Sequence, residues 1–200
     1  IPVPFYHCFG MVMGNLGCVT HGACMVIPAA SFDAAPTLAA VAEERCTSLY
    51  GVPTMFIAEL GLPDCTDYDL SSLRTGIMAG SPCPVEVMKR VVSEMGMTEV
   101  TICYGMTETS PVSAMTTTDD PIEKRINTVG RLMPHVEAKI VNPADRSQIL
   151  PINTRGELAV SGYLVMKEYW GAPDKTAEVL IPDENGKLWM HVSLVKSLTR

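Results

Sequence analysis

The sequence predicts an α/β fold, in which parallel-sheet layers with flanking helices are followed by a small, barrel-like β subdomain. Two observations favour this class. Helix-type and strand-type patterns alternate through the first 108 residues, which is typical of a parallel sheet with helices on both faces. From Val129 onward the segments are short, strand-like and separated by Pro, Gly, Asn and Asp. We therefore predict an α/β part over residues 1–128, a β part over 129–191 and an aberrant tail over 192–200.

The predicted parallel sheet is built from segments in the first half of the chain. Residues 23–27 are an unbroken apolar run stopped by Pro28, which is typical of a fully buried strand. Asp33 can cap the next helix, because its side chain can accept a backbone N–H that the helix leaves unpaired. Further strands are expected at residues 47–52, 75–79 and 100–103, and helices at 10–22 (beneath a pocket), at 55–60 and from Pro84 onward.

The second half of the chain is expected to hold the shorter strands of the β part. A polar loop separates the two halves at residues 116–121. Strands are expected at residues 136–141, 157–161 and 187–191, with short helical pieces at 166–170 and after Pro173.

Composition limits the classes of function. The 200 residues suit one domain or one and a half, and 47% apolar residues allow a sizeable core. The net charge is −7 and no basic run occurs, so a nucleic-acid surface is not expected. The seven cysteines include no C-x-x-C pair, which predicts reduced, buried thiols in an intracellular protein. The apolar region 8–30 is broken by polar residues and glycines, so no transmembrane segment is predicted.

The candidate site follows the strand at residues 100–103. It is the run Tyr104-Gly105-Met106-Thr107-Glu108, and the end of a strand is where α/β sheets bind ligands. Tyr104 can lie against a flat ring, and Thr107 can hydrogen-bond a phosphate oxygen. Glu108 can hold Mg²⁺, which prefers oxygen ligands and commonly bridges substrate phosphates. Taken alone, this pattern is also that of an ordinary loop.

Other residues with chemical potential have simpler interpretations. Ser81 is not predicted to be a hydrolase nucleophile, because G-x-S-x-G would need glycines where Ala79 and Cys83 stand. Asp119 and Asp120 are interpreted as part of a polar loop rather than as a metal site. The 13 methionines fit a core filler better than a flexible acyl channel, although both interpretations stay open.

Several motifs in a fixed order carry a family resemblance. Together they resemble the AMP-forming acyl-CoA synthetases of the adenylate-forming superfamily, and most closely its medium-chain acyl-CoA synthetase members. The likeness runs from residue 1 to about 191 and implies part of the large N-terminal domain of such an enzyme. The motifs are Pro4-Phe5-Tyr6-His7, Ala79-Gly80-Ser81-Pro82, Tyr104-Gly105-Met106-Thr107-Glu108, Gly130-Arg131, Gly156-Glu157-Leu158 with Gly162, and Tyr169-Trp170-Gly171.

The resemblance implies a two-step ligase reaction. A carboxylate attacks the α-phosphate of ATP to give acyl-adenylate and pyrophosphate, and the thiol of CoA then displaces AMP. Because two anions must meet, positioning and electrostatics carry the first step. The implied partners are therefore a small carboxylic acid, ATP with Mg²⁺, and CoA.

The resemblance also implies roles for individual residues. Glu108 would bind Mg²⁺, and Thr107 would bond the α-phosphate. Tyr104, Gly105 and Met106 would border the nucleotide, with Tyr104 against the adenine and Gly105 allowing a tight turn beside it. His7 would line the acyl pocket near the reacting carboxylate. The backbone slot for adenine would be formed by Gly80, Ser81 and Pro82.

Three family features are missing from the 200 residues. They are the phosphate loop with its lysine, the Thr-Gly-Asp that should follow Trp189, and the small C-terminal domain. Val192-Ser193 can be encoded by GTGAGT, a splice-donor sequence, so we interpret residues 192–200 as a translated intron. Transcript sequencing tests this interpretation. The chain by itself is expected to be inactive and poorly soluble, because its sheet would lack neighbouring strands.

The favoured substrate is a medium- or long-chain fatty acid. No Arg or Lys lies in residues 5–17 to pair with a second carboxylate, which favours a monoacid with an apolar tail. An aryl or secondary-metabolite acid is the alternative, and an inactive, truncated nucleotide-binding fragment is a second one. The resemblance fits a mitochondrial or peroxisomal location, while the organelle and the oligomeric state stay open.

Overall fold

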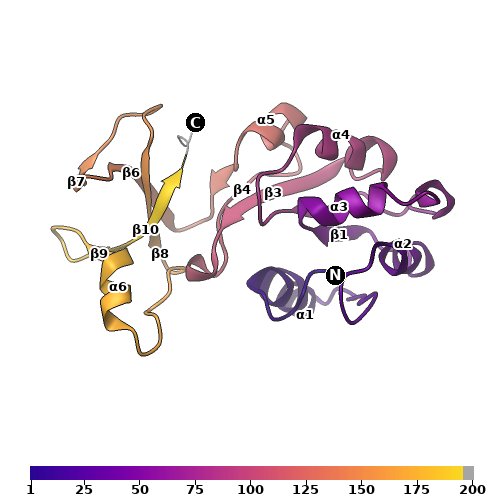
Figure 1. Cartoon of the computed structure of the whole chain (residues 1–200), viewed down its shortest axis with the longest axis horizontal. Coiled ribbons are helices and arrows are strands. Elements are labelled where there is room, and N and C mark those ends of the chain that lie inside the picture. Colours follow the sequence, from indigo (N-terminus) through magenta and orange to yellow (C-terminus); the bar gives the residue numbers. More distant parts are fainter. Residues whose placement is uncertain (196–200) are drawn as a thin grey trace. The chain divides into compact units, whose positions relative to one another are not determined.

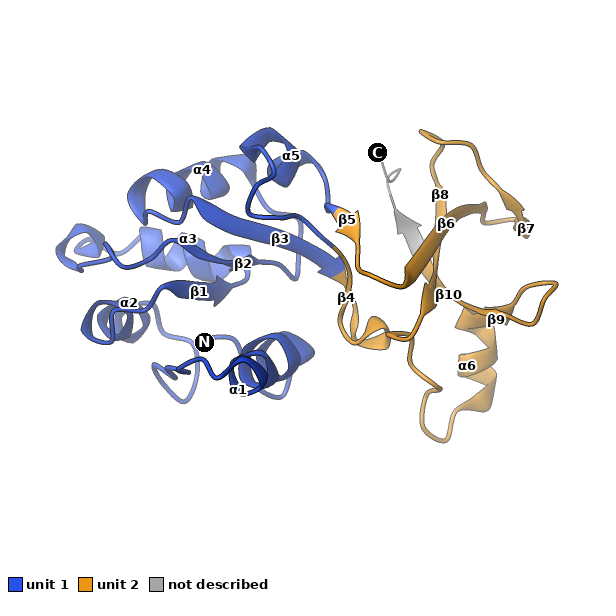
Figure 2. Ribbon diagram, turned by 180° about the vertical axis from the view of Figure 1, so that it is seen from behind, with its two compact units in different colours: residues 1–104, 115–130 blue, residues 105–114, 131–200 orange. Residues whose placement is uncertain are grey.

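The computed structural model describes residues 1–195, with side chains up to Val192 (Figure 1). The chain divides into two compact units (Figure 2). The first unit contains residues 1–104 and 115–130, and the second contains residues 105–114 and the chain from 131 onward. The sequence-based division between residues 128 and 129 stays a prediction.

Three parallel strands form the predicted sheet of the first unit. They are β1 (Ser48–Gly51), β2 (Thr75–Met78) and β3 (Glu99–Gly105). Ser48 pairs with Thr75, which pairs in turn with Glu99. The strand order of this sheet is β1-β2-β3-β4-β5, where β4 is Val112–Met115 and β5 is Arg131–Leu132. The predicted α/β class with a parallel sheet is confirmed.

Helices flank this sheet. Those expected at residues 10–22, after Asp33, at 55–60 and from Pro84 onward are present, whereas the helices at Cys65–Asp67 and Ile122–Asn127 are not expected from the sequence. Asp33 caps α2 by accepting the backbone N–H of Ala35 at 3.3 Å. The sequence predicts Pro84 as the first residue of α4, but this prediction is wrong: Pro84 is the N-cap, and the helix begins at Val85. The helices are η1 (Phe9–Leu16, a π-helix), α1 (Gly17–His21), α2 (Ala34–Glu43), α3 (Pro53–Leu60), η2 (Cys65–Asp67, a 3₁₀-helix), α4 (Val85–Glu94) and α5 (Ile122–Asn127).

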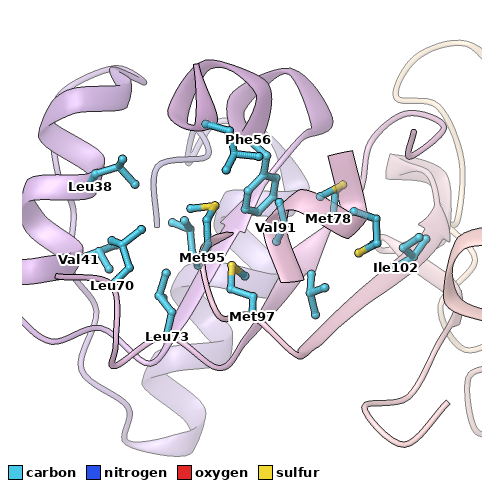
Figure 3. Close-up of a cluster of buried hydrophobic side chains, with 14 residues drawn as sticks. Leu38, Val41, Phe56, Leu70, Leu73, Met78, Val91, Met95, Met97 and Ile102 are labelled. Carbon is cyan, nitrogen blue, oxygen red and sulfur yellow. The ribbon is translucent and has the colours of Figure 1, made fainter. Parts of the chain in front are cut away.

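Both faces of the parallel sheet are packed against helices. Successive strand side chains point to opposite faces and belong to two different hydrophobic clusters. On one face, Leu49, Met78 and Val100 pack with side chains from α2, α3 and α4 (Figure 3). On the other face, Ile77 and Ala79 pack with Phe9 of η1. Four methionines are fully buried in the larger cluster, which agrees with their interpretation as core filler: Met78, Met88, Met95 and Met97.

The prediction of a strand at residues 23–27 is wrong. The structure has no strand there, and Cys24 and Ile27 are exposed. β1 is at one end of the strand order, so no described strand pairs with this apolar run. An apolar composition makes a run suitable for a buried strand, but a strand forms only where a neighbour supplies the ladder hydrogen bonds.

The second unit contains a five-stranded antiparallel sheet with the order β7-β6-β8-β10-β9. Its elements are η3 (Thr107–Thr109), β6 (Val136–Asn142), β7 (Asp145–Ile149), β8 (Gly156–Gly162), α6 (Pro173–Val179), β9 (Leu180–Pro182) and β10 (Leu188–Val195). The predicted strands at 136–141, 157–161 and 187–191 are confirmed. Strand β7 is not expected from the sequence, because its residues are all exposed and only Ile149 is apolar, so no apolar alternation marks it.

Two other expectations for this half need correction or stay open. Residues 166–170 are not helical, because the amides of Met166 and Tyr169 bond to Glu108 and Thr176 instead of to carbonyls of their own turn. Residues 192–195 of the predicted aberrant tail continue β10 opposite β8, with an irregular register between Val192 and Val195. The remaining tail residues, 196–200, lie outside the described residues, and the intron interpretation stays a prediction.

Candidate functional site

The carboxyl ends of β2 and β3 bring two candidate segments to one edge of the first unit's sheet. Met78 pairs with Ile102 in the parallel register. Gly80 and Tyr104 each follow that pair by two residues, so they leave neighbouring strands at the same edge. This edge is where parallel α/β sheets bind ligands. Tyr104 is half-buried, and this burial raises the pKa of its hydroxyl.

The side chain of Thr116 fixes the strand just before Tyr104. Ile102 donates its backbone N–H to Thr116 Oγ1 at 2.9 Å, and the Thr116 N–H donates to the Ile102 carbonyl oxygen at 2.9 Å. Thr116 itself is buried. The end of β3 is therefore held by a threonine from the loop that the sequence marks only as polar.

Gly80, Ser81 and Pro82 form an exposed turn after β2. Gly80 has a φ of +93°, in the left-handed region that favours glycine, and an added Cβ would lie 3.0 Å from Val52 Cγ1. Its backbone is therefore open to a ligand from the solvent side. Next to this turn, burial raises the pKa of the Cys83 thiol to about 11.

The seven cysteines are all free, as predicted. They are less buried than predicted: Cys24 is exposed and the other six are partly buried. Burial raises the pKa of the Cys103 thiol to about 12. A thiol with so high a pKa is a poor nucleophile, because the thiolate is the reactive form.

His7 lies exposed just before η1. The backbone N–H of Phe9 donates to His7 Nδ1 at 3.1 Å. Nδ1 must therefore accept, so the neutral ring carries its proton on Nε2. His7 can thus present an N–H donor to a carboxylate oxygen.

Gly105 begins the part of the motif that belongs to the second unit. An added Cβ would lie 1.7 Å from the carbonyl oxygen of Pro111, so only glycine fits. The sequence attributes this glycine to a tight turn beside the nucleotide. In the structure, Gly105 is the last residue of β3, and the close approach is to the chain's own backbone at Pro111.

A buried threonine shapes the turn that carries Thr107 and Glu108. The backbone N–H of Met106 donates to Thr109 Oγ1 at 3.1 Å, and the Thr109 hydroxyl lies 3.3 Å from the Pro111 carbonyl oxygen. This arrangement closes the 3₁₀ turn of η3. Thr107 is exposed at the turn, and Glu108 is half-buried.

Glu108 is held by a segment 61 residues further along the chain. The hydroxyl of Tyr169 donates to Glu108 Oε1 at 2.8 Å, and this hydrogen bond raises the pKa of Tyr169. The backbone N–H of Met166 donates to the Glu108 carbonyl oxygen at 2.9 Å. The sequence includes Tyr169 only as a motif marker, and no local pattern indicates that it contacts Glu108.

A carboxylate with a neutral donor fits a magnesium ligand. The Tyr169 hydroxyl does not neutralise Glu108, which keeps a charged oxygen ligand of the kind that Mg²⁺ prefers. Within residues 1–195, no group of three or more His, Cys, Asp or Glu side chains could hold a metal. Mg²⁺ commonly takes further ligands from substrate phosphates and water, so Glu108 could serve as a single protein ligand.

The predicted site residues are divided between the two units. The first unit contains His7, Gly80, Ser81, Pro82 and Tyr104, and the second contains Gly105, Met106, Thr107 and Glu108. The structure brings the Gly80 and Tyr104 segments together within the first unit, and Glu108 and Tyr169 within the second. Each of these roles toward a ligand stays a prediction.

The loop at Asp119 and Asp120 is structural in this fold. Asp120 accepts the Lys124 ammonium at 2.7 Å and the Thr117 backbone N–H at 2.9 Å. These hydrogen bonds, that of Lys124 first, lower the pKa of Asp120 to about 2. The carboxylate therefore fixes the start of α5.

Residues 1–170 match the sequence profile of the family described as AMP-binding enzyme. This chain belongs to the AMP-binding enzyme family. The resemblance drawn from the ordered motifs is thereby confirmed. Among the described residues, no helix is long and apolar enough to span a membrane.

Curated relatives in this family are named acyl-CoA ligases or synthetases. The chain is 51% identical over 189 residues to acyl-CoA ligase SID4 of Ajellomyces capsulatus, covering 94% of this chain and 32% of that protein. It is 53% identical over 183 residues to the putative acyl-CoA synthetase YngI of Bacillus subtilis, covering 92% and 33%. It is 46% identical over 183 residues to the mitochondrial medium-chain acyl-CoA ligase ACSF2 of Danio rerio, covering 92% and 30%. The chain thus spans about a third of the length of these relatives.

Several solved structures share the fold of this chain. The amide bond synthetase McbA of Marinactinospora thermotolerans is 28% identical, with a TM-score of 0.77 over 98% of this chain and 40% of that one. The ATP-bound RpMatB-BxBclM chimera B1 is 28% identical, with a TM-score of 0.80 over 98% and 36%. The long-chain-fatty-acid-CoA ligase FadD1 of Archaeoglobus fulgidus, at 21% identity and a TM-score of 0.82 over 95% and 39%, shows the fold alone.

Proposed function

We propose that the protein carrying this sequence is an acyl-CoA ligase that activates a medium- or long-chain fatty acid with ATP. The supporting observation is the family match over residues 1–170, together with relatives at 46–53% identity that are named acyl-CoA ligases or synthetases. The acid would first become an acyl-adenylate with release of pyrophosphate. CoA would then take the acyl group, and AMP would leave.

The residues of the first unit would bind the nucleotide base and the acid. The exposed backbone of Gly80, Ser81 and Pro82 would receive the adenine edge, and Tyr104 from the neighbouring strand would lie against the ring. The Nε2–H tautomer of His7 would donate to the reacting carboxylate. These groups align the substrates and need no covalent intermediate with the protein.

The residues of the second unit would act on the phosphates. The exposed hydroxyl of Thr107 would donate to the α-phosphate, and Glu108 would hold Mg²⁺. The ion, when bound, neutralises phosphate charge that would otherwise repel the carboxylate. Thr109 and Tyr169 keep the turn and the Glu108 carboxylate in one arrangement, so little reorganisation is needed at the moment of reaction.

The proposed acid has an apolar tail. The absence of Arg and Lys from residues 5–17, and relatives named medium-chain acyl-CoA ligase, favour an acid with an apolar tail. The alternative is an aryl or secondary-metabolite acid. McbA, an amide bond synthetase at 28% identity, shares the fold under a name other than acyl-CoA ligase, so we keep that alternative beside the fatty acid. A mitochondrial or peroxisomal location is proposed from the family resemblance and from relatives named as mitochondrial.

Pyrophosphate release from the full-length protein tests the reaction. ATP, Mg²⁺ and CoA would be supplied with fatty acids of increasing chain length and, in parallel, with benzoate-type acids. We expect release that depends on a medium- or long-chain fatty acid, with the matching acyl-CoA as product. Turnover of aryl acids alone would contradict the fatty-acid assignment, and no acid-dependent release would contradict the ligase assignment.

The same assay tests the proposal that these 200 residues are insufficient. We expect no turnover from the chain alone, because it spans only about a third of the length of the ligases that it matches. Weak nucleotide binding without turnover would fit the inactive-fragment alternative for this form of the chain. Turnover at a rate comparable with the full-length protein would refute the expectation.

A further inference from the structure

Tyr169 is the residue whose side chain contacts the Glu108 carboxylate within the second unit. Its hydroxyl lies 2.8 Å from Glu108 Oε1, a short distance for a hydrogen bond to a charged acceptor. The neighbouring backbone contributes as well, because the Met166 N–H bonds the Glu108 carbonyl oxygen at 2.9 Å. Both the main chain and the side chain of Glu108 are therefore held by the segment 166–169.

The segment that holds Glu108 is itself fixed by the first turn of α6. The backbone N–H of Tyr169 donates to Thr176 Oγ1 at 2.9 Å. The Thr176 hydroxyl donates to the Ala172 carbonyl oxygen at 3.0 Å, and the Ala172 N–H donates to the Tyr169 carbonyl oxygen at 3.0 Å. These hydrogen bonds hold the backbone of Tyr169 in place. Its side chain has few rotatable bonds, so ordering it costs little conformational entropy.

The chemistry of this donor suits a metal ligand. A lysine or arginine at this place would neutralise the carboxylate and compete with a cation, whereas a phenol hydroxyl directs one oxygen and leaves the negative charge. Oε1 accepts the hydroxyl, so Oε2 keeps its full acceptor capacity for an ion. A metal ligand commonly depends on such an orienting hydrogen bond.

We propose that Tyr169 is the positioning residue for Glu108, and that its hydroxyl orients the carboxylate toward the magnesium ion that accompanies ATP. This inference rests on the proposed function, because it requires Glu108 to bind that ion. Thr176 supports the same arrangement by accepting the backbone N–H of Tyr169. Tyr169 does not touch the reacting atoms, so its removal changes the affinity for the metal more than the binding of the acid.

The test uses the full-length protein and Mn²⁺ as a spectroscopic substitute for Mg²⁺. Binding of Mn²⁺ in the presence of a non-hydrolysable ATP analogue is measured by electron paramagnetic resonance. We expect Tyr169→Phe to weaken Mn²⁺ binding about tenfold, which is the scale of one hydrogen bond to a charged group. The matched control is Tyr163→Phe, since Tyr163 is 74% exposed in the same unit, and it should leave the affinity unchanged.

A second set of measurements separates positioning from folding. Tyr169→Phe should require about tenfold more Mg²⁺ for half-maximal pyrophosphate release, while its KM for the acid and its melting temperature stay close to those of the wild type. Saturating Mg²⁺ should restore most of kcat. Thr176→Val, which keeps the tyrosine hydroxyl, should shift the Mg²⁺ requirement in the same direction by a smaller factor.

Glu108→Gln distinguishes failure of this inference from failure of the proposed function. If Glu108→Gln abolishes Mn²⁺ binding and Tyr169→Phe leaves it unchanged, Tyr169 does not position the ligand, although the metal assignment stands. If Glu108→Gln itself leaves Mn²⁺ affinity unchanged, the proposed metal role of Glu108 is wrong, and the inference fails with it. A fall in the melting temperature of Tyr169→Phe without a change in Mn²⁺ affinity would show a structural role and overturn the proposal.

Discussion

The guanidinium of Arg125 donates a hydrogen bond to the carbonyl oxygen of Val100 at 2.7 Å. The same nitrogen bonds the Thr98 carbonyl oxygen at 2.9 Å, and Arg125 is only 7% exposed. A buried arginine on α5 therefore satisfies backbone carbonyls at the start of β3, the strand that leads to Tyr104. Arg125 thus helps to hold β3 in place at the end of the strand opposite to Tyr104.

Replacing Arg125 should destabilise the first unit. Arg125→Met removes the donor from two carbonyl groups and should lower the free energy of unfolding by about 1–3 kcal/mol. Denaturant unfolding of the full-length protein provides the measurement. Arg155→Met is the matched control, because Arg155 is exposed, and it should change the stability by less than about 0.5 kcal/mol. Equal stability of the two variants would contradict the role of Arg125.

Gly105 should tolerate no side chain. In Gly105→Ala, the Cβ would meet the Pro111 carbonyl oxygen at 1.7 Å, so the strand end or the turn after it must move. We expect a loss of about 2 kcal/mol or more in stability, as for other overpacked sites, together with loss of pyrophosphate release. Gly17→Ala is the control, because its Cβ would find only ordinary contact, at 3.8 Å, in a helix. Alanine should be neutral or slightly stabilising there.

Glu59 should make the stability of the 200-residue chain depend on pH. Glu59 is 1% exposed, and neither carboxyl oxygen has a hydrogen-bond partner among the described residues. Burial raises the pKa of Glu59 to about 8. Between the ordinary value of 4.5 and about 8, the unfolded chain releases this proton while the folded chain keeps it. Stability should therefore fall as the pH rises through that window, by up to about 1.4 kcal/mol per pH unit.

Glu59→Gln should remove this pH dependence. The amide has no proton to lose, so the variant should match the wild type near pH 5 and be more stable near pH 8. Unfolding free energies measured across this range give the two slopes. Glu43→Gln, at an exposed position of α2, should leave the slope of the wild type unaltered. Parallel slopes for wild type and Glu59→Gln would refute the assignment.

The ion pair between Arg146 and Glu157 should stabilise the second unit. Arg146 donates from Nε and from its terminal amino group to the two oxygens of Glu157, at 2.7 and 2.9 Å, and Glu157 is buried. Arg146→Met leaves that carboxylate without its two donors, and we expect a loss of about 1–3 kcal/mol in thermal or denaturant unfolding. Lys89→Met breaks a pair whose side chains are 58% and 79% exposed, so it should have little effect. A loss as large in Lys89→Met would argue against burial as the cause.

The sequence by itself determined the order of elements and the segments of the candidate site. Apolar periodicity, the Asp33 cap and the strand before Tyr104 are local signals, so they can be interpreted without knowing what lies elsewhere. The ordered motifs likewise determined the family, because six of them occur along one chain. The run 104–108 is likewise local, although its roles toward a ligand remain proposals.

Only the tertiary structure decided which of these segments found partners. The apolar run 23–27 is not a strand, because no described strand lies beside it to complete the ladder. Gly105 is required by the backbone at Pro111, and Tyr169 reaches Glu108 across 61 residues of sequence. Contacts of this kind depend on how the whole chain packs, so no local pattern could have predicted them.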